Sequence, residues 1–102
     1  MILRDIAHAR SGDKGDIANI SVIAYEAEGF ERLRAELTVE RVRAYLGKAV
    51  LGAIERYEMP DLGALNFVLH RALAGGVTRS LSLDVHGKCL GSILLGMEIG
   101  DG

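Results

Sequence analysis

The sequence predicts one α+β domain over residues 1–102, a two-layer sandwich of a mainly antiparallel sheet with two helices on one face. Three observations support this fold class. Residues 17–25 are almost all apolar and partly β-branched, as in a central strand. Apolar residues recur at helical spacing in two later segments. Residues 80–85 alternate between polar and apolar side chains, which is typical of a half-exposed strand.

The first half of the chain is expected to contain two strands and a helical region. Residues 3–10 are predicted to form a strand, residues 11–16 a polar loop, and residues 17–25 the second strand. Apolar residues between 30 and 46 then follow a helical period. Thr38 is a suitable N-cap within this region, and Gly47 is suited to end it.

The second half is expected to add a strand, a helix and a hairpin. Residues 54–58 are predicted as a strand that Pro60 stops, and Asp61 as the N-cap of a long helix over residues 62–73. Gly75-Gly76 would cap that helix. A hairpin would follow, with its turn at His86-Gly87 and its return strand over residues 90–99. The order is β-β-α-β-α-β-β, and a partner subunit is the simplest cover for the second sheet face.

Composition narrows the function classes. The net charge is −2 and Trp is absent, whereas nucleic-acid-binding domains usually have a basic face and aromatic stacking residues. The single cysteine, Cys89, cannot form an internal disulfide. No secretory signal is recognisable, and no apolar run reaches the roughly 20 residues of a membrane span. We therefore expect a cytoplasmic protein that binds neither nucleic acid nor membrane.

The densest polar cluster is the predicted loop together with its flanks. Its glycines allow backbone N–H groups to turn inward, and its two cations add positive charge, so the cluster is suited to a carboxylate or phosphate. The cluster comprises Arg10, Ser11, Gly12, Asp13, Lys14, Gly15, Asp16 and Asn19.

Two other interpretations of this cluster stay open. In the first, Asp13 and Asp16 only cap turns of a hairpin loop. In the second, Asp13, Asp16 and Asn19 bind a cation, although Lys14 among them opposes this, and we expect no metal.

Asn66 and His70, four residues apart on the predicted helix, share a face and could present a hydrogen-bonding pair to a pocket or simply be solvated. The spacing of His and Cys does not match a zinc site.

Residues 9–20, Ala-Arg-Ser-Gly-Asp-Lys-Gly-Asp-Ile-Ala-Asn-Ile, resemble the signature of the AtuA-like domain. Further short matches follow in order along almost the whole chain: Leu37-Thr38, Arg56-Tyr57-Glu58-Met59-Pro60, Leu65-Asn66-Phe67, Leu73-Ala74-Gly75-Gly76-Val77, Ser80-Leu81 with Asp84, and Gly87-Lys88. The resemblance implies a ferredoxin-like fold, in agreement with the α+β prediction. It also favours a ligand or a partner's active site over a bare hairpin as the role of residues 10–19.

The family takes its name from acyclic terpene utilisation protein A, which is associated with bacterial catabolism of citronellol and geraniol through acyl-CoA intermediates. The chain is similar to the small C-terminal part of such longer proteins. This likeness suggests an accessory or site-completing subunit that docks on a larger AtuA-type protein, or on a second copy of itself. Arg10 and Lys14 would then hold a substrate carboxylate or a CoA phosphate, with Asp13, Asp16 and Asn19 orienting it.

Two alternatives remain at this point, and whether the chain is an enzyme stays open. The first is a small homo-oligomeric enzyme for acyl hydration or isomerisation, with Asp13 or Asp16 as general base and Lys14 or Arg10 stabilising the developing anion. The second is a homodimeric ligand-binding module without chemistry. The expected substrate-binding set also includes Ser11, Gly12, Gly15 and Asn66, and no cofactor is expected.

Overall fold

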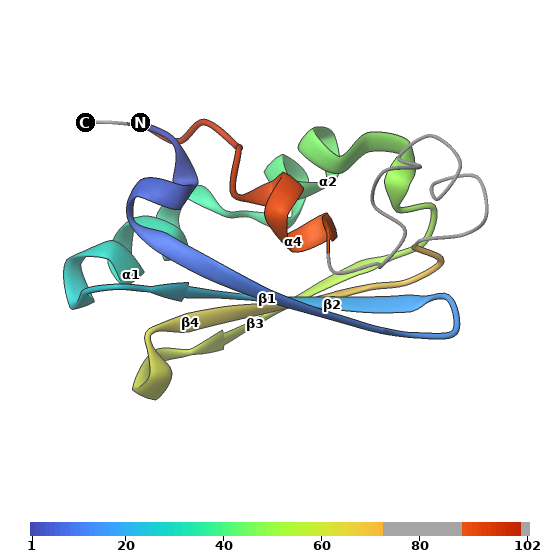
Figure 1. The fold of residues 1–102 in the computed structure, drawn as a ribbon, viewed down its shortest axis with the longest axis horizontal. Helices are drawn as coiled ribbons and strands as arrows, with labels where there is room; N and C mark the ends of the chain where they lie inside the picture. Colours follow the sequence, from blue (N-terminus) through green and yellow to red (C-terminus); the bar gives the residue numbers. More distant parts are fainter. Residues whose placement is uncertain (73–88, 101–102) are drawn as a thin grey trace.

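The computed structural model describes residues 1–72 and 89–100. They contain a four-stranded sheet in the order β1-β2-β4-β3, in which every neighbouring pair is antiparallel (Figure 1). The strands are β1 (Ala7–Lys14), β2 (Ile17–Ala24), β3 (Ile54–Met59) and β4 (Ala64–Leu69). The predicted α+β class and mainly antiparallel sheet are confirmed.

The described α-helices lie on one side of this sheet (Figure 1). They are α1 (Ala27–Glu36), α2 (Val39–Leu46) and α4 (Cys89–Leu94), and short 3-10 turns span Leu3–Asp5, Gly47–Ala49 and Pro60–Leu62. The predicted caps of α2 are confirmed. The Thr38 hydroxyl accepts a hydrogen bond from the Arg41 N–H at 3.1 Å, and Gly47 ends the helix with a φ of 57°.

The core lies between these helices and one face of the sheet. Successive side chains of a strand point to opposite faces, so alternate residues of β2 and β4 are buried on this face. The register pairs Ile20 of β2 with Phe67 of β4 there. Helix residues spaced three or four apart cover them. The fully buried members include Leu33, Val42 and Leu94 from the three helices. This alternation leaves the other side chains of β2 and β4 on the opposite face.

The predicted loop over residues 11–16 is wrong in its extent. β1 continues to Lys14, which pairs with Ile17, so only Gly15 and Asp16 form the turn of a hairpin. Gly15 has a φ of 67°, as the first turn residue of a type II′ hairpin requires. The strand prediction for residues 3–10 also changes, because Leu3–Asp5 is a 3-10 turn.

The predicted helix over residues 62–73 is wrong, because Ala64–Leu69 form the central strand β4. Leu65 and Leu69 suit a helical stripe and an alternating strand equally well. Phe67 decides for the strand, since it is fully buried between them while Asn66 and Val68 are partly exposed. Asp61 does not cap a helix, and Leu62 is 68% exposed in the β3–β4 connection.

The predicted return strand over residues 90–99 is also wrong. Residues Cys89–Leu94 form α4, and Leu90, Leu94 and Met97 are buried at helical spacing. After α4 the chain runs beside the N-terminus, where the N–H of Leu3 donates to the carbonyl of Met97 at 2.9 Å. The predicted cap at Gly75-Gly76 and the turn at His86-Gly87 lie outside the described residues. In the part of the chain that is described, no helix has the length and apolar character needed to cross a membrane.

Candidate functional site

The sheet face opposite the helices, called the open face below, carries polar residues of all four strands. No described element packs against it (Figure 1). The register sets two adjacent rows across the strands in the order β1, β2, β4, β3: Arg10, Ser21, Asn66, Tyr57 and Gly12, Asn19, Val68, Glu55. Lys14, paired with Ile17, stands one step further towards the hairpin turn. The open face therefore brings together five of the residues expected to bind substrate.

Three polar side chains at the hairpin end of this face have no partner within residues 1–72 and 89–100. They belong to Arg10, Lys14 and Asn19, and all three residues are exposed. Arg56 is the contrasting case. Its guanidinium donates to the carbonyls of Arg34 and Leu37, each at 2.8 Å, and so satisfies the C-terminal end of α1.

Gly12 leaves the space between the two cations without a side chain. On a strand, residues two apart point to the same face, so Arg10, Gly12 and Lys14 stand in line. A Cβ at Gly12 would meet only the Asn19 side chain, at 3.9 Å, which is ordinary contact. The fold thus does not require glycine here. Its effect is a gap in the row of side chains, called the trough below, between Arg10 and Lys14 on β1 and next to Asn19 on β2.

Asn66 joins the same face, by a route that differs from the prediction. It was expected to share a helix face with His70. Asn66 lies instead on β4, and His70, which directly follows β4, bonds to Glu55 on the same face. The Asn66 Nδ2 donates to the Ser21 hydroxyl at 2.8 Å, so it links β4 to β2 beside Arg10.

The remaining predicted residues of the hairpin lie elsewhere. Ser11 pairs with buried Ile20 and faces the helices, where its hydroxyl accepts a hydrogen bond from the Gly91 N–H of α4 at 2.9 Å. Gly15 and Asp16 form the exposed turn, and the Asp16 carbonyl accepts from the Ala72 N–H at 2.8 Å. Asp13 occupies the β1 position paired with Ala18, and its side chain lies outside the described part of the structure. These positions separate Ser11 from the trough.

Sequence reasoning missed a second polar cluster on the open face, at Glu55, Tyr57 and His70. The Glu55 carboxylate accepts hydrogen bonds from the Tyr57 hydroxyl and from His70 Nε2, the latter at 2.6 Å. The bond from Tyr57, and then that from His70, lowers the pKa of Glu55 below its ordinary value of 4.5. The same bond to Glu55 raises the pKa of Tyr57 above 10.0, because ionisation would remove its donor. The signal available in the sequence was the two-residue spacing of Glu55 and Tyr57 in a predicted strand.

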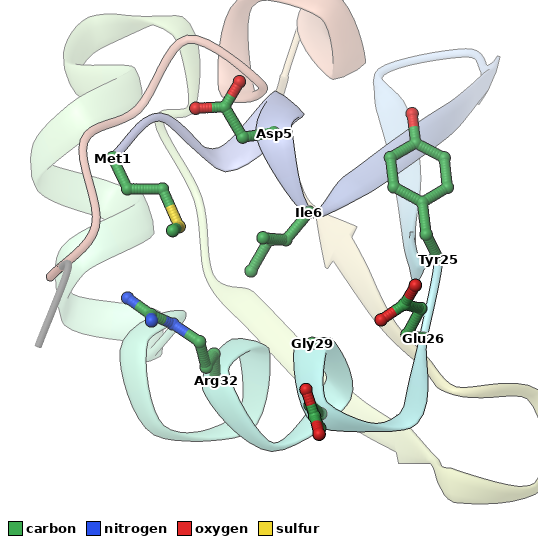
Figure 2. Close-up of a pocket in the computed structure, with 8 residues that line it drawn as sticks. Met1, Asp5, Ile6, Tyr25, Glu26, Gly29 and Arg32 are labelled. Atoms are coloured by element: carbon green, nitrogen blue, oxygen red, sulfur yellow. The ribbon is translucent and has the colours of Figure 1, made fainter.

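A cleft of about 340 Å³ lies at the far end of β2 from the hairpin (Figure 2). It is lined by Met1, Asp5, Ile6, Tyr25, Glu26, Glu28, Gly29 and Arg32. None of the sequence-predicted site residues is among them. Three carboxylates and one side-chain cation give it an acidic lining, which disfavours an anionic ligand. Among the described residues, no group of three or more His, Cys, Asp or Glu side chains is arranged to hold a metal ion.

Comparison with known proteins identifies the family. No curated protein and no solved structure matches the chain. The family model described as the AtuA ferredoxin-like domain matches residues 1–100, which is nearly the whole sequence. This match agrees with the motif of residues 9–20, whose side chains at positions 10, 14 and 19 stand on the open face. The chain therefore belongs to the AtuA ferredoxin-like domain family.

Proposed function

We propose that the chain is an accessory, site-completing unit whose open face binds an anionic group of a substrate or of a partner protein. One observation carries the proposal. The cations of Arg10 and Lys14, which bond to no described residue, stand on the two sides of Gly12, with the Asn19 amide across from it, on a face that no described element covers. A guanidinium matches a carboxylate or phosphate with two parallel hydrogen bonds, and an ammonium adds charge beside it.

Energetics favour a site that a second surface completes. An ion pair open to water contributes only about 0.2–1 kcal/mol, because the solvent screens it. The trough by itself is therefore a weak anion site. A partner packed over the sheet would exclude water, and the same charges would interact several times more strongly at lower effective dielectric. Shared anion binding at a covered face fits an accessory unit better than a free-standing enzyme.

The family resemblance supports a more specific assignment of the ligand. AtuA-type proteins are associated with catabolism of acyclic terpenes through acyl-CoA intermediates. We propose that the anion belongs to such an intermediate or to a related acid, whose carboxylate or CoA phosphate would lie over Gly12. The larger partner would be an AtuA-type subunit, or a second copy of this chain.

A capture experiment with matched variants tests this proposal. The tagged chain is used to recover partners from lysate of its own source, and these are identified by mass spectrometry. We expect a stoichiometric large partner that is lost with Arg10→Ala/Lys14→Ala. The control, Arg4→Ala/Lys48→Ala, removes the same charge from exposed positions on other elements and should retain the partner.

Two results would contradict the accessory role. Equal capture of the partner by both double variants would show that the partner does not bind through the trough. Turnover of an acyl-CoA by the purified chain at ordinary enzymatic rates, abolished by Asp13→Asn or Asp16→Asn, would instead favour the small enzyme with an aspartate base.

A further inference from the structure

The hydrogen bond between Glu55 and His70 sets which imidazole nitrogen is free. A carboxylate only accepts hydrogen bonds, so the His70 Nε2 at 2.6 Å from it carries a proton. In the neutral imidazole, Nδ1 is then an acceptor. No described residue bonds to Nδ1. The Tyr57 hydroxyl donates to the other oxygen of Glu55 and so fixes the carboxylate from a second side.

The backbone around His70 is held unusually tightly. The His70 N–H donates to the Ala53 carbonyl, and the His70 carbonyl accepts from the Gly52 N–H, both at 2.9 Å. Any side chain at position 52 would place Cβ 2.7 Å from that carbonyl oxygen. Arg71 follows with a φ of 56°, a left-handed conformation that costs a non-glycine residue of order 1 kcal/mol or more and that clusters at functional positions.

These features place His70 beside the trough. Leu69 pairs with Ala18, so His70 stands one register step further, next to Ile17, whose other neighbour is Lys14. Neighbouring strands are about 5 Å apart, so the backbones of Lys14 and His70 are separated by about 10 Å. The bond from the Ala72 N–H to the Asp16 carbonyl fixes this segment against the hairpin turn. His70 and Lys14 thus belong to one face, about 10 Å apart at their backbones, and neither Nδ1 nor the Lys14 ammonium bonds to a described residue.

We propose that His70 Nδ1 accepts a hydrogen bond from a hydroxyl group of the ligand whose anionic group Lys14 and Arg10 hold, so that the open face selects a hydroxy acid. Glu55 and Tyr57 are positioning residues, which keep the proton on Nε2 and so leave Nδ1 as the acceptor. This inference rests on the proposed anion site. It adds the ligand's hydroxyl group, which the trough alone does not specify.

A pair of matched probes tests the inference. Binding of 3-hydroxybutyrate and of butyrate to the full-length ¹⁵N-labelled chain is followed by NMR. We expect 3-hydroxybutyrate to bind roughly 3- to 10-fold more tightly, which is the net effect of one hydrogen bond. His70→Ala should reduce its affinity to that of butyrate.

Three controls separate the possible causes. His8→Ala removes a second described histidine of the open face, which stacks on Tyr25 with ring centroids 5.5 Å apart, and should retain the preference. Lys14→Ala should weaken both acids by the same factor. Glu55→Gln should reduce the preference without changing butyrate affinity, whereas a purely structural role of Glu55 would not alter the ratio of the two affinities.

The outcomes distinguish this inference from the proposed anion site. Equal binding of the two acids by the unmodified chain, or a preference that survives His70→Ala, would overturn the role of His70 and leave the anion site standing. If neither acid bound to the unmodified chain, both the role of His70 and the anion site would be overturned.

Discussion

Polar residues on the two faces of the sheet differ in what they bond to. On the helix-covered face, Ser11 accepts from Gly91 of α4, and Arg56 donates to the last carbonyls around α1. On the open face, Arg10, Lys14 and Asn19 have no partner among the described residues. The polar groups named on the covered face hold the helices in place, whereas the side chains of Arg10, Lys14 and Asn19 stay available to a ligand. Substitutions at neighbouring positions should therefore have different consequences.

The largest contrast is expected between two neighbours on β4. Phe67 is fully buried under the helices, so Phe67→Ala should lower the free energy of unfolding by about 3–5 kcal/mol. Asn66 stands on the open face and bonds to Ser21, so Asn66→Ala should cost only about 0.5–1.5 kcal/mol. Urea denaturation of both variants measures the difference. Equal losses would mean that the open face is also buried.

A smaller contrast is expected between neighbours on β1. Ser11→Ala removes the acceptor of an N–H in the first turn of α4 and should cost about 1 kcal/mol of stability. Arg10→Ala should change stability by less than about 0.5 kcal/mol. It should nevertheless weaken carboxylate binding, which Ser11→Ala should leave intact in the folded protein. If the carboxylate affinity fell with Ser11→Ala and not with Arg10→Ala, the assignment of carboxylate binding to the open face would be contradicted.

Gly12 offers a change in which stability and binding move in opposite directions. Glycine within a strand is destabilising by roughly 0.5–1 kcal/mol relative to alanine, and Cβ meets no close atom at this position. Gly12→Ala should therefore raise the thermal midpoint while it fills the floor of the trough and weakens anion binding. Stronger binding in this variant would contradict the trough as the anion site.

The smallest expected effect concerns the pH dependence of Glu55 and Tyr57. The pKa of Glu55 is lowered by folding, so its contribution to stability is present above 4.5 and is lost as the pH falls through the folded value. The pKa of Tyr57 is raised, so its contribution is present below 10.0 and is lost as the pH rises through the folded value. Glu55→Gln should flatten both limbs of the thermal midpoint against pH and lower the Tyr57 pKa, measured by ultraviolet titration. A Tyr57 pKa that is unchanged in Glu55→Gln would contradict the hydrogen bond between Tyr57 and Glu55.

Much of the fold and part of the site followed from the sequence. Thr38 and Gly47 delimited α2 correctly, because caps act locally. Residues 64–69 were predicted wrongly, since Leu65 and Leu69 fit both the helical and the strand period. Only the place of this segment between β2 and β3 makes it a strand. Arg10, Lys14 and Asn19, which composition and motif singled out, lie close together on the open face. Ser11 was misplaced because a loop has no alternating faces. The contact of Glu55 with His70 was missed because it joins residues 15 apart, one on β3 and one directly after β4.

The most direct test of the open face is a chemical-shift map of the full-length ¹⁵N-labelled chain titrated with butyrate. Weak binding, in about the millimolar range, is expected for a few exposed charge-assisted hydrogen bonds. The account predicts perturbed amides around Arg10, Gly12, Lys14 and Asn19, and their loss with Arg10→Ala/Lys14→Ala. Perturbations centred on the cleft near Asp5, Tyr25 and Arg32, unaffected by that variant, would contradict it.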